Sequence, residues 1–221
     1  MTQGRGEHMV INHNMPSLNQ HRIMKTNVKN TEDSSRKLSS GYRINEDADD
    51  AAGLCISETM RHQVRGLDRA SSNVQDGISM IQTADAALEE TQQILDRMVE
   101  LATQAANDIN TTADRTAIQD EVEQLKSEID HIAYDTNFNQ QYMLAEGTPK
   151  AKPGFFKIQA GSLADQSVTI NFVNASKESL GVADVDMTSY EGASESIAKI
   201  QNAIEIAATW RDQFGATQEQ L

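Results

Sequence analysis

The feature that most constrains the fold is a long stretch without proline, from Ala51 to Asn107. Apolar residues recur there at alternating steps of three and four, with polar residues at three of the expected positions: Ser71, Asp85 and Gln92. A periodic pattern of this length without internal caps is typical of a long coiled-coil helix. We therefore predict one long helix with an imperfect apolar seam, formed by Met60, Val64, Leu67, Val74, Ile78, Ile81, Leu88, Leu95 and Val99.

A second helical pattern follows the turn at residues 110–112. Thr111 and Asp114 have the spacing of a capping box, in which each side chain bonds the backbone N–H of the other residue. The apolar positions that follow show a four-three rhythm: Ile118, Val122, Leu125, Ile129 and Ile132. We expect this helix to fold back antiparallel on the long one.

Strand patterns appear in residues 147–192. Residues 156–160 and 168–172 alternate apolar with polar side chains and are separated by turn residues, which predicts a small β-hairpin. A hairpin of this size must lie on the helices to be stable. Helical periodicity returns after Ser194, the expected N-cap, and continues to Leu221.

The N-terminal part is poor in apolar residues. Residues 12–40 can form an amphipathic helix, but it would bury too little surface to be stable alone. We expect this segment to be disordered in the monomer and ordered by a partner, with Gly41 as a left-handed cap. The acidic residues 45–50 then begin the long helix, where carboxylates favour the helix dipole. A cation site is the weaker interpretation, because the regular spacing of a cation-binding loop is absent.

Composition excludes several classes of function. The formal net charge is −14 and the isoelectric point is near 4.7, which disfavours nucleic-acid binding because phosphate contacts depend on clustered Lys and Arg. No signal-peptide pattern and no apolar run long enough to span a membrane occurs. Residues 1–8 are interpreted as a tag or extension. The single cysteine, Cys55, permits no intrachain disulfide and is expected to be a small buried helix residue.

Catalytic patterns are absent from the sequence. It contains no H-E-x-x-H motif and no nucleophile motif, and its five histidines are scattered. His62 and His131 are expected on solvated helix surfaces. We therefore predict that the chain is not an enzyme and has no catalytic residues, metal site or cofactor.

The hydrophobic content of 38% with only 5% aromatic residues is low for a compact core. The predicted fold class is mainly α: an elongated, antiparallel coiled-coil helical bundle with a small β-hairpin region. The expected segments are an extension (residues 1–8), an N-terminal helix (9–45), a helical rod (46–146), the hairpin region (147–192) and a C-terminal rod helix (193–221).

Three parts of the sequence match one known family. Residues 38–45 (LSSGYRIN) and 49–54 (DDAAGL) resemble the N-terminal signature of bacterial flagellins. Residues 72–79 (SNVQDGIS) and 82–88 (QTADAAL) are similar to the long helix of that family, and residues 211–218 (RDQFGATQ) to the start of its C-terminal helix. Hook–filament junction proteins share the first signature, whereas the ordered match through the later segments favours flagellin proper.

The resemblance implies a subunit of the flagellar filament that assembles by pairing its terminal helices. Its partners would be other flagellin subunits and the flagellar export machinery, with no nucleic acid and no membrane. The protein would be secreted to the extracellular flagellum without a cleaved signal peptide. Flagellins continue for tens of residues beyond the position of Leu221, so the alternatives are a junction protein or a non-polymerising chain that acts only as a ligand of an immune receptor.

The resemblance also implies a face that binds Toll-like receptor 5, carried by residues 95–101. In this sequence the matching residues are Arg97, Leu101, Gln104 and Glu121. The first three share one helical stripe, and the core seam is expected on the neighbouring stripe at Leu95, Val99 and Ala102. Val99 stands where many members of the family carry a second Arg, which would lower the affinity. The alternative interpretation is that Arg97 and Glu121 form only a solvated interhelical ion pair.

Overall fold

The computed structural model describes residues 14–145 and 154–221. The described chain is mainly α, as predicted, with four helices and two small antiparallel sheets. It divides into two compact units, residues 1–62 (unit 1) and 63–221 (unit 2), which are treated separately below. The predicted extension at 1–8 and the boundary expected after residue 146 lie outside the described residues.

Unit 1 contains helix α1, Met15–Ser40, which begins and ends at clear capping residues. The side chain of Asn14 accepts a hydrogen bond from the backbone N–H of Ser17 at 3.2 Å, and a proline occupies the first turn. At the other end Gly41 is left-handed, with φ 72°, and donates its N–H to Lys37 O. The prediction of a glycine cap is confirmed.

The acidic residues after α1 make contacts within unit 1. Helix α2, Asp47–Ala105, is interrupted at Asp50, whose carboxylate accepts the N–H of Gly53 at 3.0 Å. Asp49 pairs with Lys37 at 3.0 Å, and its other carboxylate oxygen accepts the N–H of Asn45. The Lys37 ammonium and the Asn45 N–H lower the pKa of Asp49. These carboxylates therefore cap a helix and form ion pairs.

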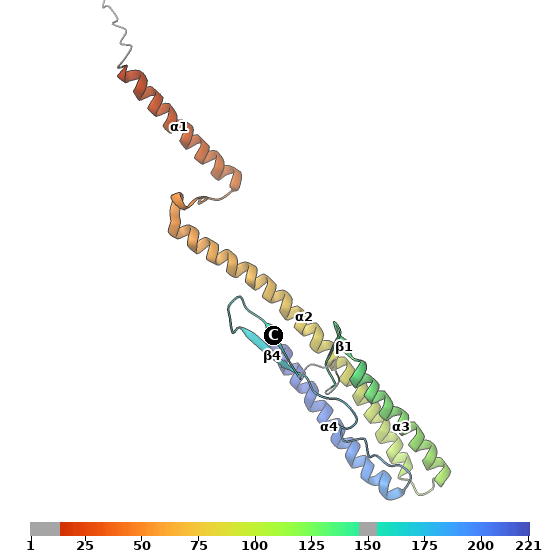
Figure 1. The fold of residues 1–221 in the computed structure, drawn as a ribbon. Coiled ribbons are helices and arrows are strands. Elements are labelled where there is room, and N and C mark those ends of the chain that lie inside the picture. The colour runs from red at the N-terminus through yellow and green to blue at the C-terminus, as the bar shows by residue number, and fades with distance from the viewer. Residues whose placement is uncertain (1–13, 146–153) are drawn as a thin grey trace, which may run out of the picture. The chain divides into compact units, whose positions relative to one another are not determined.

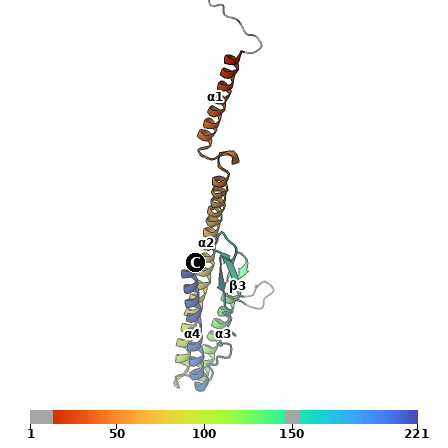
Figure 2. The ribbon, with the colours of Figure 1, turned by 90° about the vertical axis from the view of Figure 1, so that its left-hand side faces the viewer.

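Unit 2 is a helical bundle built from the rest of α2, helix α3 (Thr112–Asp135) and helix α4 (Tyr190–Gln220). The three helices lie side by side in both views, and α3 runs antiparallel to α2 after a short turn (Figure 1, Figure 2). The predicted capping box is present: the Thr111 hydroxyl accepts from the N–H of Asp114 at 3.3 Å, and Asp114 accepts from the N–H of Thr111 at 3.0 Å.

Two apolar clusters form the core of unit 2. One joins α2, α3 and α4 with the apolar residues of the loop before α4, including Leu180 and Met187. The other joins the helices with the hairpin, where the ring of Phe172 lies 5.4 Å from Phe156 and 5.5 Å from Phe214. The single tryptophan, Trp210, packs against both clusters.

The predicted hairpin is formed by β3 (Phe155–Gln159) and β4 (Ser167–Asn171), which pair antiparallel with Lys157 opposite Thr169. A second hairpin, β1 (Asn137–Phe138) and β2 (Gln141–Tyr142), was not predicted. Its turn residues have positive φ, 50° at Asn139 and 64° at Gln140. Two residues with positive φ are the pattern of a type I′ turn, which matches the twist of the flanking strands.

Three expectations about burial and boundaries were wrong. Helix α4 is capped by Ser189, whose hydroxyl accepts the N–H of Gly192 at 3.0 Å, and the predicted cap Ser194 lies inside the helix. The sequence pattern missed this start because Ser189 and Ser194 are both acceptable N-caps by residue type. Cys55, expected to be buried, is exposed. The start of the predicted seam is likewise uncovered by described residues, with Met60 at 59% exposure and Leu67 at 51%.

Candidate partner-binding surfaces

Arg97 and Glu121, two of the four residues of the predicted receptor face, contact one another. The guanidinium of Arg97 donates from Nε and from a terminal nitrogen to Glu121 Oε1, at 3.2 and 2.9 Å. Its other terminal nitrogen donates to Glu100 at 2.9 Å. The Glu121 carboxylate, followed by that of Glu100, raises the pKa of Arg97. Arg97 is about half exposed, at 50%, so it is a fixed cation that solvent and partners can reach.

Within the described part of the chain, the side chains of the other two residues of that face, Gln104 and Leu101, form no hydrogen bond or ion pair with the Arg97–Glu121 pair, and they differ in exposure. Gln104 is exposed near the end of α2, where its backbone oxygen accepts from the side chain of Asn110. Leu101 is only 2% exposed and belongs to the core, whereas Val99, expected in the seam, is partly buried. The expected seam was too narrow, because α2 packs against both α3 and α4 and buries a wider stripe.

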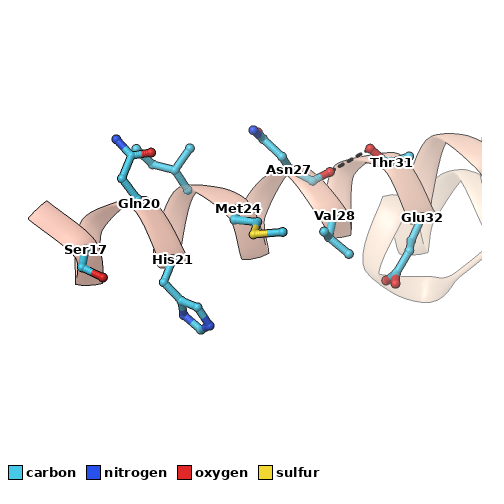
Figure 3. A pocket seen from close by; sticks show the side chains of 9 residues that line it. Ser17, Gln20, His21, Met24, Asn27, Val28, Thr31 and Glu32 are labelled. Carbon is cyan, nitrogen blue, oxygen red and sulfur yellow. Dashed lines mark hydrogen bonds between the residues drawn. The ribbon is translucent and has the colours of Figure 1, made fainter.

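Helix α1 presents a second surface, along which apolar side chains are open to solvent. No residue of α1 is buried. Figure 3 shows Met24 and Val28 beside polar neighbours along one side of the helix, and a hollow of about 740 Å³ runs past them. Met24 is 66% exposed and Val28, one helical turn further on, is 48% exposed. The helix therefore has an apolar side that no described residue covers.

Polar residues of α3 hold the loop that precedes α4, a contact that the sequence analysis missed. We call residues 173–188 the strap. The Lys126 ammonium, 3% exposed, donates to Val185 O at 2.9 Å and to Ala183 O at 3.1 Å, and pairs with Glu123 at 2.8 Å. The Lys126 ammonium lowers the pKa of Glu123. Lys126 thus satisfies two carbonyls of the strap and is itself fully hydrogen-bonded.

Two further α3 residues continue this row. Gln119 accepts the N–H of Met187 at 2.6 Å, and Asp130 accepts the N–H of Lys177 at 3.2 Å while pairing with its ammonium at 2.9 Å. The row has the four-three-four spacing of one helix face: Gln119, Glu123, Lys126 and Asp130. This polar periodicity beside the apolar one is the signal by which the sequence would have indicated a second packed face on α3.

A polar contact also joins α2 to α4. Arg211 donates to Asp85 at 2.9 Å and to Gln92 at 3.2 Å, and a third nitrogen–oxygen distance, to Glu89, is 3.4 Å. The Asp85 carboxylate raises the pKa of Arg211. Asp85 and Gln92 are two of the polar residues that interrupt the predicted seam, and both face the guanidinium.

The described residues show no arrangement for metal binding. They contain no group of three or more His, Cys, Asp or Glu side chains placed to hold a metal ion. His131 is exposed on α3, 3.6 Å from Asp135, and His62 is exposed on α2. A separate finding is that none of the described helices combines the length and the hydropathy that crossing a bilayer requires.

The fold defines a class of protein: a helical bundle with capped helices and polar contacts between its helices. Its candidate binding surfaces are the Arg97–Glu121 face and the exposed apolar side of α1. Comparison with known proteins identifies the family. Residues 11–148 match the model of the bacterial flagellin N-terminal helical region. The chain belongs to the bacterial flagellin family, whose members are structural proteins.

Relatives of known sequence are also flagellins. A flagellin of Clostridium tyrobutyricum is 51% identical over 179 residues, which cover 80% of this chain and 47% of the relative. A flagellin of Halalkalibacterium halodurans is 41% identical over 215 residues, covering 96% of this chain and 77% of the relative. The chain thus spans about half the length of the first relative and about three quarters of the second.

Solved structures agree with the fold. The crystal structure of Bacillus cereus flagellin matches with a TM-score of 0.59 and 36% identity, over 66% of this chain and 82% of that one. The structure of FliC from Burkholderia pseudomallei matches with a TM-score of 0.56 over 66% of this chain and all of that one. At 16% identity the second match supports the fold alone.

Proposed function

We propose that this chain is a structural subunit of the bacterial flagellar filament, assembled with other flagellin subunits for motility. In this function the protein passes through the flagellar export machinery without a cleaved signal peptide and acts outside the cell. Membership of the flagellin family supports the assignment. The −14 net charge fits a solvated outer surface.

The observation that carries the proposal is the uncovered apolar side of α1. A helix in water gains most of its stability from packing one apolar face, and α1 has no buried residue along Met15–Ser40. Exposed Met24 and Val28 are the side chains that such packing would cover. A partner helix supplied by assembly would cover them, and a filament of paired helices provides one.

Deletion of the gene in the source bacterium tests this function. We expect cells without filaments by electron microscopy and no swimming, with both restored by the intact gene. Gold-labelled antibody against the chain should decorate the filament along its length. Label confined to the hook end would indicate the alternative, a hook–filament junction protein. Normal, unlabelled filaments in wild-type cells would contradict both assignments.

A second candidate function is recognition by Toll-like receptor 5, through Arg97, Gln104 and Glu121. The favouring observation is that Arg97 is held between two carboxylates and remains half exposed. A pre-oriented arginine is a common centre of binding energy at protein interfaces. Buried Leu101 would support this face from beneath the surface.

Binding of the folded protein to the receptor ectodomain tests the second function. Arg97→Ala should weaken binding by about tenfold or more, the range of interface hot spots. Lys199→Ala is the matched control, because Lys199 also forms an exposed ion pair on a helix, with Glu195. Leu101→Ala should lose helicity and binding together. Equal affinities for Arg97→Ala and the control would place the interface elsewhere. Receptor binding by a chain absent from filaments would support the remaining alternative, a ligand that does not polymerise.

A further inference from the structure

A groove of about 400 Å³ lies between α2 and α4, away from the predicted receptor face. Its lining includes Ile81 and Phe214, each 1% exposed, together with polar residues contributed by both helices. The polar lining residues are Asp85, Gln92, Arg211, Asp212 and Gln218. The groove thus has an apolar floor that is already packed within the chain, and its polar residues Asp212 and Gln218 are the ones exposed to a partner.

Gly215 lines this groove from inside α4. Glycine in a helix interior costs about 1 kcal/mol relative to alanine. Two other helix glycines have a steric reason within the chain, since a Cβ at Gly66 would lie 2.7 Å from Ser162 and one at Gly77 would lie 3.2 Å from Ile158. A Cβ at Gly215 would meet no described atom within 4 Å. The missing side chain therefore leaves room for the close approach of a backbone from outside the chain.

The charge around the groove indicates what can approach. Asp85 and Glu89 together neutralise Arg211, and Asp212 is exposed beside them without an ion pair to any described residue. The surroundings are therefore acidic, on a chain whose net charge is already −14. Another copy of the chain would be repelled here unless it presented a cation.

Lys157 is such a cation. It lies on the exposed side of β3, opposite Thr169, and within residues 154–221 and 14–145 it forms no ion pair. The neighbouring Ile158 is the residue that approaches Gly77 of α2, so Lys157 faces the other way, because successive strand residues alternate. Most other described cations of unit 2 are already bound in ion pairs: Arg97, Arg115, Lys126, Lys177, Lys199 and Arg211.

We propose that the groove around Gly215 receives the outer face of the β3–β4 hairpin from a second copy of this chain. Lys157 of that copy lies against Asp212, and its strand backbone packs over Gly215. The two surfaces are different parts of one chain, so the contact is heterologous and can repeat without closing, as an open assembly requires. This inference rests on the proposed filament function and names a contact within it.

Gene replacement in the source bacterium tests the contact. Gly215→Leu fills the space, Lys157→Glu and Asp212→Lys each place like charges together, and the double variant Lys157→Glu with Asp212→Lys restores opposite charges. The readout is the ratio of filament-bound chain to soluble chain in the medium. We expect each single variant to lower this ratio by about tenfold or more, since like charges at an interface are strongly unfavourable. The charge-reversed double variant should recover most of it.

Ala198→Leu is the control, because Ala198 is exposed on α4 and does not line the groove. Purified variants should keep wild-type helicity and Trp210 emission. If Gly215→Leu fails to fold, the test rests on the variants of the exposed residues Lys157 and Asp212. Wild-type ratios for the charge variants, or no recovery in the double variant, would overturn the contact while leaving the filament function intact. Absence of the wild-type chain from filaments would instead refute the proposed function on which the contact depends.

Discussion

Replacing Lys126 by methionine tests whether the polar row on α3 stabilises unit 2. Lys126 is 3% exposed, and its ammonium bonds two strap carbonyls and one carboxylate. Methionine occupies a similar volume without a polar atom, so the substitution removes the hydrogen bonds and opens little cavity. We expect a clear loss of stability, because both strap carbonyls lose the donor that Lys126 supplies.

The size of the loss follows from what each acceptor keeps. Ala183 O loses the bond that Lys126 donates, whereas Val185 O retains a longer contact of 3.4 Å from the side chain of Gln119. Glu123 is 57% exposed and can be rehydrated by water. A buried acceptor without a partner costs about 1–3 kcal/mol. Relief from burying the ammonium charge offsets part of this, and we expect a net loss of about 2 kcal/mol.

Urea unfolding followed by Trp210 emission measures this loss, since Trp210 packs against both core clusters. Lys199→Met is the matched control. Lys199 pairs with Glu195 on the surface of α4, and its contact with the strap, to Asp184 O, is long at 3.5 Å, so we expect its replacement to cost less than about 0.5 kcal/mol. A Lys126→Met protein within about 0.5 kcal/mol of the wild type would refute the reasoning, because it would show that the strap needs no polar anchor.

Three further predictions concern stability and order. Gln140→Gly should stabilise the protein by about 0.5–1 kcal/mol in thermal unfolding, because φ is 64° at this position, whereas Gln141→Gly in β2 should destabilise it. The fold lowers the pKa of Glu123 through Lys126 and the pKa of Asp186 through Thr188, so the unfolded chain takes up more protons in acid. The free energy of unfolding, measured by urea titration, should therefore be full above about pH 5 and fall below about pH 4. A flat profile would contradict this. Amide hydrogens of α1 should exchange rapidly in the isolated chain while those of α3 stay protected, and slow exchange throughout α1 would count against its need for a partner.

The local features of the fold were predictable because short-range rules govern them. The capping box at Thr111 and Asp114, the glycine cap at Gly41 and the β3–β4 hairpin each depend on residues close in sequence. The cap of α4 was misplaced because Ser189 and Ser194 are both acceptable N-caps by residue type. In the fold the hydroxyl of Ser189 accepts the N–H of Gly192, so the helix begins there.

The candidate surfaces were harder to predict because burial depends on the number of packed neighbours. A helix with one neighbour buries one stripe, and the sequence analysis placed Leu101 outside that stripe. With α3 and α4 both packed on α2, the buried surface widens to include Leu101 at 2% exposure. Periodicity alone cannot give the number of neighbours, so Arg97 and Glu121 were placed together correctly while Leu101 was not.

The polar interruptions of the seam make a final point about specificity. A purely apolar seam along α2 would permit α4 to slide by one heptad at little cost, since each heptad offers similar apolar contacts. Asp85 and Gln92 lie one heptad apart and both bond the same guanidinium, Arg211. A slide of seven residues would move Arg211 away from one of them and leave a carboxylate or an amide against the apolar face. The seam therefore gives up some apolar burial at these two positions, and the polar contact fixes a single register between α2 and α4.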